Sequence, residues 1–195
     1  MTTVASPSSP DHVTTGPIMG STKVWSTPEG HAHIRVPFRE IALEPSANEP
    51  PVRVYDTSGP YTDPTVRIDV RAGLEPIRAP WIAARNLPTV TPRTVRPEDN
   101  GFARGENLVP ACPAPHAVHE GQPGQMVTQY EFARAGIITE EMIYAAHREN
   151  LGRATMDEGA EARRADGEDF GADIPAFVTP EFVRSEIAAG RAILP

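Results

Sequence analysis

A chain of 195 residues with a formal net charge of −8 can form one domain with long excursions, but it lacks the basic stripe through which proteins bind nucleic acid. No stretch approaches the ~20 apolar residues of a membrane span, and the N-terminus lacks the apolar core of a signal peptide. The single cysteine, Cys112, excludes an internal disulfide and is typical of a reducing compartment. The composition therefore predicts a cytoplasmic protein that binds neither nucleic acid nor membrane.

The 22 prolines and 15 glycines exceed what a typical globular chain carries, so we expect a small core wrapped in irregular segments. Residues 1–17 are mostly Ser, Thr and Pro without periodicity, and we expect them to form a disordered tail. Residues 18–195 are expected to form one α+β domain. Its predicted parts are a small, mostly antiparallel sheet (residues about 21–75), a few helices (about 128–150 and 180–189) and long Pro-rich irregular arms.

The first ordered block begins near Ser21, where residues 22–26 and 32–36 have the composition of short strands. Between them, residues 27–30 place Pro at the second and Gly at the fourth position of a turn, as a type I turn prefers. The pattern predicts a β-hairpin that is closed by this turn.

Three further strands are predicted over residues 38–43, 52–55 and 66–70. Strict alternation places Val52 and Val54 on one face of their strand. In the last segment alternation turns three aliphatic side chains inward and leaves the polar ones outside. These strands lie close together along the chain, so they favour an antiparallel sheet. The inward-facing residues are Val66, Ile68 and Val70.

From Arg85 to about Gln125 no pattern of helix or strand persists. Prolines forbid a long helix and would interrupt a central strand. They are Pro88, Pro92, Pro97, Pro110, Pro113, Pro115 and Pro123. A structureless loop of this length is unusual inside a compact domain, so we expect an arm that packs on another part of the protein.

Helices follow with clear start and stop signals. Residues 128–135 precede Gly136, which is suited to a left-handed C-cap, and a second helix is expected between Thr139 and Gly152. Thr179 followed by a proline predicts the start of a last helix over about 180–189. The acidic setting argues against a DNA-reading role for the helix pair, and the polar, acidic residues 154–173 are expected to form a loop.

The densest group of metal-ligand types is Cys112 with His116 and His119, and Glu120 is a conceivable fourth ligand. A zinc site needs three or four such ligands in tetrahedral geometry, but no paired C-x-x-C motif supports one here. We therefore predict an ordinary Pro-rich surface loop without metal. A small zinc enzyme built on these residues remains an alternative.

Three other histidines carry weaker signals. His31 and His33 alternate on a candidate strand and would share a face, which could present two imidazoles to a ligand. His147 lies on a predicted helix, four residues after Ile143, where packing or capping is a more ordinary role than general-base catalysis. None of the three is assigned a catalytic role.

The richest polar loop contains our candidates for a contact with another domain: Tyr55, Asp56, Thr57, Ser58 and Asp63. Gly59 permits close backbone approach there. The loop has no Lys or Arg to neutralise phosphate and no phosphate-binding glycine motif. Ordinary turn chemistry explains the same composition and is the interpretation that we favour. Ser58 lacks the G-x-S-x-G setting of a nucleophile, so no catalytic or substrate-binding residue is predicted.

Several segments nevertheless resemble the phosphomethylpyrimidine synthases, most specifically NEPPVRVYDTSGPYTDP at residues 48–64. The others follow the order of that family from about residue 17 to the end of the chain. They include IDVRAGL at 68–74, RAPWIAAR at 78–85, VTQY at 127–130, GIIT at 136–139, REN at 148–150, VTPEFVR at 178–184 and GRA at 190–192.

This resemblance implies a longer parent enzyme with an N-terminal domain, a (β/α)₈ barrel and a C-terminal segment whose three cysteines hold a [4Fe–4S] cluster. Such an enzyme rearranges aminoimidazole ribotide into hydroxymethylpyrimidine phosphate with S-adenosylmethionine, in thiamine biosynthesis, and its barrel also binds zinc. The resemblance covers only the portion before the barrel, and the apolar residues Ile193 and Leu194 at the end look like a strand that has been cut.

The resemblance therefore implies that this chain alone is inactive and holds no cofactor. Its expected role is structural: it covers its own barrel and contributes to a homodimer. The loop from Tyr55 to Asp63 is the first expected contact, and residues 78–85 are the second. A free-standing binding or assembly module without catalytic activity is the alternative.

Overall fold

The computed structural model describes residues 19–63, 65–69, 73–74, 76–91, 93–107, 117–153 and 175–194. The chain divides into two compact units, one formed by residues 17–59 with 126–195 and the other centred on residues 60–125. The expected α+β class is confirmed, because small antiparallel sheets and helices make up the structure. The predicted tail (1–17) and acidic loop (154–173) lie outside the described residues.

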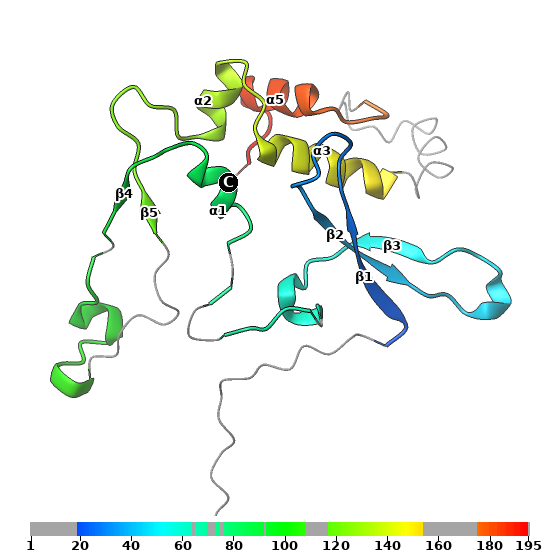
Figure 1. The fold of residues 1–195 in the computed structure, drawn as a ribbon, viewed down its shortest axis with the longest axis horizontal. Coiled ribbons are helices and arrows are strands. Elements are labelled where there is room, and N and C mark those ends of the chain that lie inside the picture. The colour runs from blue at the N-terminus through cyan, green and yellow to red at the C-terminus, as the bar shows by residue number, and fades with distance from the viewer. Residues whose placement is uncertain are drawn as a thin grey trace, which may run out of the picture. The chain divides into compact units, whose positions relative to one another are not determined.

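The first unit contains a three-stranded antiparallel sheet in the order β1-β2-β3 (Figure 1). Its strands are β1 (Ser21–Ser26), β2 (Val36–Ile41) and β3 (Val52–Tyr55), and a 3₁₀ turn, η1 (Pro45–Ala47), lies in the connection between β2 and β3. β1 and β2 form an antiparallel hairpin, but its second strand is not the one predicted over residues 32–36. The strand predicted over residues 52–55 is confirmed.

The strand predicted over residues 32–36 is wrong, because β2 begins only at Val36. Two successive turns occupy the preceding residues. The His31 N–H donates to the Pro28 carbonyl (3.0 Å), and the Ile34 N–H donates to the His31 carbonyl (2.9 Å). These local bonds use the backbone groups that a strand would have paired, and residues 36–41 form a single strand from the two predicted ones.

Strand register divides the side chains of this sheet between two faces, since directly paired residues point to the same side. The helix face, which lies toward α3 (Glu140–Arg153), carries Thr22, Val24, Ser26, Val36, Phe38, Glu40, Arg53 and Tyr55. The open face carries Ser21, Lys23, Trp25, Pro37, Arg39, Ile41, Val52 and Val54. Asp56 continues the open face, because its N–H donates to the Pro37 carbonyl (3.1 Å). Val36 and Phe38 are buried on the helix face.

Three helices of the described residues complete the first unit: α2 (Gln129–Arg134), α3 and α5 (Pro180–Ala188). They agree with the predicted helices to within about two residues. In Figure 1, α3 lies between the sheet and the α2–α5 pair, and it contacts both the sheet and α5. The three helices, which we call the helical corner, enclose a small apolar core of Ala133, Met142 and Ile187.

Local signals fix the ends of these helices: those at Thr179 and Gly136 were predicted, whereas the capping box at Thr128 was not. Thr128 and Glu131 form a reciprocal capping box at the start of α2. The Thr179 hydroxyl accepts from the Phe182 N–H (3.1 Å) at the start of α5. Gly136 adopts a positive φ of 79° directly after α2, where only glycine does so without strain.

Two polar side chains tie the helical corner together. The Asn150 amide donates to the Val178 carbonyl (2.7 Å) and accepts from the Val178 N–H (2.8 Å). The Arg184 guanidinium donates to the Ala133 carbonyl (3.0 Å), near the end of α2. The first two bonds pair the backbone groups of Val178, which precedes α5, and the third adds a second donor to the Ala133 carbonyl, which also accepts from the Gly136 N–H (3.1 Å).

The second unit has little regular structure. Its elements are α1 (Ala79–Ala83), the two-residue strands β4 (Thr89–Val90) and β5 (Val118–His119), and the 3₁₀ turns η3 (Pro97–Asn100) and η4 (Gly105–Asn107). The short turn η2 (Gly59–Thr62) lies at its beginning. β4 and β5 pair antiparallel. The irregular course expected for this region is found between these elements, whereas α1 was not predicted.

The strand predicted over residues 66–70 is wrong for the four of these residues that the structure describes, since 66–69 lie in no strand. Local turns use their backbone groups: the Val66 N–H donates to the Asp63 carbonyl (3.2 Å), and the Gly73 N–H donates to the Asp69 carbonyl (3.0 Å). Ile68 is buried as expected, but Val66 is exposed.

Candidate interdomain contact site

The open face of the sheet contains a buried row of charged side chains, contributed by three neighbouring positions of the ladder. Arg39, on β2, donates to Asp56 Oδ2 (2.8 Å), and Lys23 Nζ lies 3.5 Å from the same oxygen. Their side chains are between 2% and 9% exposed. Lys23 also donates to the Gly59 carbonyl, and Arg39 donates to Ser21 Oγ (3.0 Å). We call Lys23, Arg39 and Asp56 the ionic row.

Asp56 is held in its charged form by this setting. Burial alone would raise the pKa of Asp56, but the hydrogen bonds from the Ser58 side chain and N–H, with the charges of Lys23 and Arg39, lower that pKa below its usual value. The Ser58 N–H donates to Asp56 Oδ1 (2.8 Å), and the Ser58 hydroxyl donates to the same atom. The carboxylate therefore remains ionised and closes a turn at the end of β3.

Asp63 forms the same kind of turn within the second unit. Its Oδ1 accepts from the Thr65 N–H (2.9 Å) and from the Thr65 hydroxyl (2.6 Å). Both aspartates of the candidate loop thus hold their own backbone two residues further on, which is the ordinary chemistry of Asp in turns. A contact of this loop with another domain stays a prediction.

Tyr55 points to the other side of the sheet, toward α3. Its hydroxyl lies 2.9 Å from the hydroxyl of Tyr144, and the Arg148 guanidinium lies 5.0 Å from its ring centre. Burial and the neighbouring phenol raise the pKa of Tyr144, so the Tyr144 phenol is neutral at physiological pH. Thr57 is exposed, and hydrogen bonds bring the candidate residues Asp56 and Ser58 together.

His147 joins α3 to the sheet through a hydrogen bond between its Nε2 and Ser26 Oγ (2.8 Å). Burial lowers the pKa of His147, which favours the neutral imidazole. A catalytic Ser–His pair also needs a group that orients the second ring nitrogen and donors for an oxyanion. Within the described residues no hydrogen bond to His147 Nδ1 supplies that orientation, so we assign the pair to packing.

Among the residues that the structure describes, the other histidine signals give no ligand site. Cys112 and His116 lie outside the described residues, while His119 is half-buried on β5. Over the described ranges, no group of three or more His, Cys, Asp and Glu side chains is arranged to hold a metal ion. His31 and His33 stack edge-on with ring centres 6.1 Å apart, but they lie in a turn rather than on a strand.

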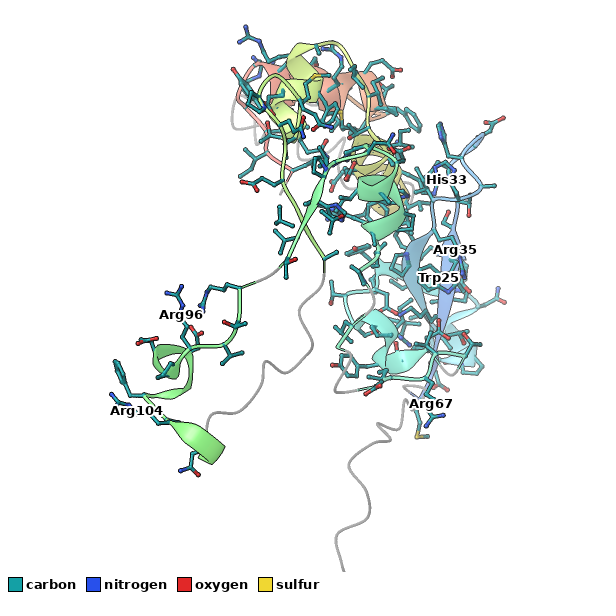
Figure 2. All side chains as sticks on the ribbon, turned by 60° about the vertical axis from the view of Figure 1, so that its left-hand side comes forward. Trp25, His33, Arg35, Arg67, Arg96 and Arg104 are labelled. Carbon is teal, nitrogen blue, oxygen red and sulfur yellow. The ribbon has the colours of Figure 1, made fainter. Side chains whose placement is uncertain are left out.

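One feature of the open face was not predicted. Trp25 is contacted by two cations, since the Arg35 guanidinium lies 4.3 Å and Lys23 Nζ 5.5 Å from its ring. Figure 2 shows Trp25 and Arg35 next to each other at the edge of the sheet. The alternation of Lys23 and Trp25 along β1 was visible in the sequence, but the place of Arg35 depends on where β2 begins.

These observations define a small α+β protein whose sheet is stabilised by the ionic row. Within the described residues we find no catalytic cluster. Residues 17–88 match the family model of the ThiC-associated domain. The chain is therefore related to ThiC, the phosphomethylpyrimidine synthase of thiamine biosynthesis, and the predicted resemblance to its N-terminal portion is confirmed. The match includes the three-stranded sheet, the ionic row and α1 but ends before the helical corner.

No helix in the part of the chain that the structure describes is long and apolar enough to cross a membrane. The longest, α3, has 14 residues, fewer than the ~20 that a spanning helix needs.

Proposed function

We propose that this chain is the non-catalytic N-terminal portion of a cytoplasmic phosphomethylpyrimidine synthase, where it covers part of the catalytic barrel and contributes to a homodimer. The observation that carries the proposal is the ThiC-associated domain at residues 17–88. The family-like segments at 127–150 and 178–192, outside that match, add support. In this proposal the full-length enzyme converts aminoimidazole ribotide to hydroxymethylpyrimidine phosphate with S-adenosylmethionine.

The residues of this chain do not fit the cofactors of that reaction. A [4Fe–4S] cluster is held by several cysteine thiolates, and this sequence contains one cysteine. The described residues also lack a metal-binding group of three. We therefore derive no catalytic step from this chain. Within the described residues, what this chain contributes is a rigid sheet. The ionic row cross-links the sheet on one face, and α3 does so on the other.

The proposal is tested with the purified 195-residue chain and with the full-length enzyme that it predicts. We expect the full-length enzyme to bind a [4Fe–4S] cluster and to convert aminoimidazole ribotide, and the 195-residue chain to do neither. Product formation is followed by mass spectrometry, and cluster content by iron and sulfide analysis. Turnover by the short chain, or a full-length protein without this activity, would contradict the proposal.

The alternative is a free-standing binding or assembly module. The helical corner favours this alternative, because the first unit has its own capped helices and its own apolar core. The coding sequence after the Pro195 codon separates the two functions: a barrel-coding continuation supports the enzyme portion, and a stop codon supports the module.

A further inference from the structure

The open face of the sheet is apolar where a solvent-facing sheet would be polar. An antiparallel sheet with one packed face usually alternates apolar residues toward the core with polar residues toward water. Here Ile41, Val52 and Val54 are 38%, 42% and 41% exposed, and Trp25 is 40% exposed. Ile41 and Val52 are direct cross-strand partners, so these three aliphatic side chains form a strip and not isolated positions.

The ionic row lies in the ladder between Ile41 and Trp25, and Val54 of the strip lies beside it as the cross-strand partner of Arg39. Lys23 and Arg39 are direct cross-strand partners one ladder step from the Ser21–Ile41 pair and one step from the Trp25–Pro37 pair. Because the row joins three strands through Asp56, it fixes the backbone of the face before any partner arrives. A preorganised surface loses less conformational entropy on binding.

Arg35 determines which charge a partner of the open face should carry. Its guanidinium stacks on Trp25 at 4.3 Å, and stacking uses the flat face of the group while its N–H donors point outward in the plane. In the part of the chain that is described, Arg35 makes no hydrogen bond or ion pair. The carboxylate of the open face, Asp56, is buried and engaged. An exposed cation without an exposed carboxylate, in a chain of net charge −8, is complementary to an acidic group on a partner.

We propose that the open face is the surface through which this domain docks on the catalytic domain of the full-length enzyme, on an apolar patch that offers a carboxylate to Arg35. The inference rests on the proposed function and goes beyond it by naming the face and the chemistry of its partner. A nucleic acid fits less well, since one exposed cation releases few counterions. Trp and Arg in contact at the rim of an aliphatic strip are the residue types that dominate the energy of protein interfaces.

The experiment is hydroxyl-radical footprinting of the 195-residue chain and of the full-length enzyme under matched conditions. We expect Trp25, Ile41, Val52 and Val54 to be oxidised in the short chain and protected several-fold in the full-length enzyme. Tyr130 and Phe177, which are 48% and 67% exposed and lie away from the sheet in the helical corner, serve as internal controls. Equal oxidation of the open face in both proteins would overturn the inference while leaving the proposed function intact.

Two variants separate docking from folding. Val54→Asp and Arg35→Glu should lower the melting temperature of the full-length enzyme more than that of the short chain, because only the full-length enzyme has the partner surface. Phe177→Asp and Arg104→Glu, at exposed positions, should lower it equally in both. Equal effects of the open-face variants would refute docking at this face. Concentration-dependent protection in the short chain alone would assign the face to a second copy and also refute it. A full-length protein without thiamine-pyrimidine activity would instead sink the proposed function.

Discussion

The sheet and the helical corner bury polar groups in opposite ways, although they belong to one unit. The open face of the sheet buries three charged side chains, Lys23, Arg39 and Asp56, around one carboxylate oxygen. The helical corner buries the apolar side chains of Ala133, Met142 and Ile187 and adds neutral amide contacts such as that of Asn150 with the backbone of Val178. Its buried charged side chain is Glu141. The two regions should therefore respond differently to substitution and to pH.

This difference predicts which of the two regions loses more stability when a single side chain is changed. Ionised groups taken out of water are expensive, and their attraction repays the cost only while every partner is present. Apolar packing is graded, because the cost of removing a side chain depends on how far the surroundings relax. The ionic row should therefore lose more stability than the core of the helical corner when one side chain is changed. Four substitutions test that ranking.

The largest expected effect is that of Asp56→Asn, which keeps the shape of the side chain and removes the charge between Lys23 and Arg39. Breaking a buried pair by removing one partner costs about 3–5 kcal/mol of unfolding free energy. Urea denaturation followed by circular dichroism measures it at pH 7. The matched control is Asp99→Asn, whose pair with Arg93 is exposed and should matter little. Similar losses of unfolding free energy at the two positions would show that the ionic row does not behave as a set of buried charges.

Next in size is Met142→Ala in the helical corner. Met142 is fully buried in the core with Ala133 and Ile187, and truncation of a buried Met to Ala costs about 2–5 kcal/mol. Thermal and urea denaturation measure the loss. Met19→Ala, at a position that is 96% exposed, should leave stability unchanged. If Met142→Ala cost more than Asp56→Asn, the proposed ranking of the two regions would be reversed.

These two regions also differ in how far the sequence predicted them. The helices were placed to within about two residues, because Thr179 and Gly136 act on their own or adjacent turns. Such signals are local and need no knowledge of the rest of the fold.

The sheet was predicted less well, because its form depends on partners far away in the sequence. Residues 66–69 alternate like a strand, yet the turn at Asp63 uses their hydrogen bonds. The ionic row joins positions separated by 33 residues between Lys23 and Asp56, and no local pattern indicates that pairing. Alternation did place Val52 and Val54 on one face, but it could not reveal that this face is half-exposed.

A smaller effect is expected from Asn150→Ala, which removes both hydrogen bonds to Val178. Val178 is buried, so its backbone N–H and carbonyl would lose their partners at a cost of about 1–3 kcal/mol. Chemical denaturation measures the change, and Asn107→Ala, at an exposed position of η4, is the control. A loss as large as that of Asp56→Asn would mean that neutral and ionic contacts are equally brittle here, against the comparison above.

The smallest effect is expected at the joint between the two regions, where His147 of α3 contacts Ser26 of β1. Burial lowers the pKa of His147 in the folded state, whereas in the unfolded chain it returns to about 6.5. Below that value the unfolded state binds the proton more readily, so stability is complete above pH 6.5 and is lost as the pH falls toward the folded-state pKa. Wild type should therefore lose stability between pH 7.5 and 5.5 in ~0.1 M salt.

His147→Gln retains a polar group for Ser26 but does not titrate, so its melting temperature should fall less over the same pH interval. His33→Gln, at an exposed turn position, should keep the slope of the wild type. If His147→Gln and the wild type had the same slope, the joint would not sense pH and His147 would be as accessible to protons in the folded chain as in the unfolded one. A flatter slope would show that His147, which joins α3 to β1, is held as a neutral imidazole in the folded chain.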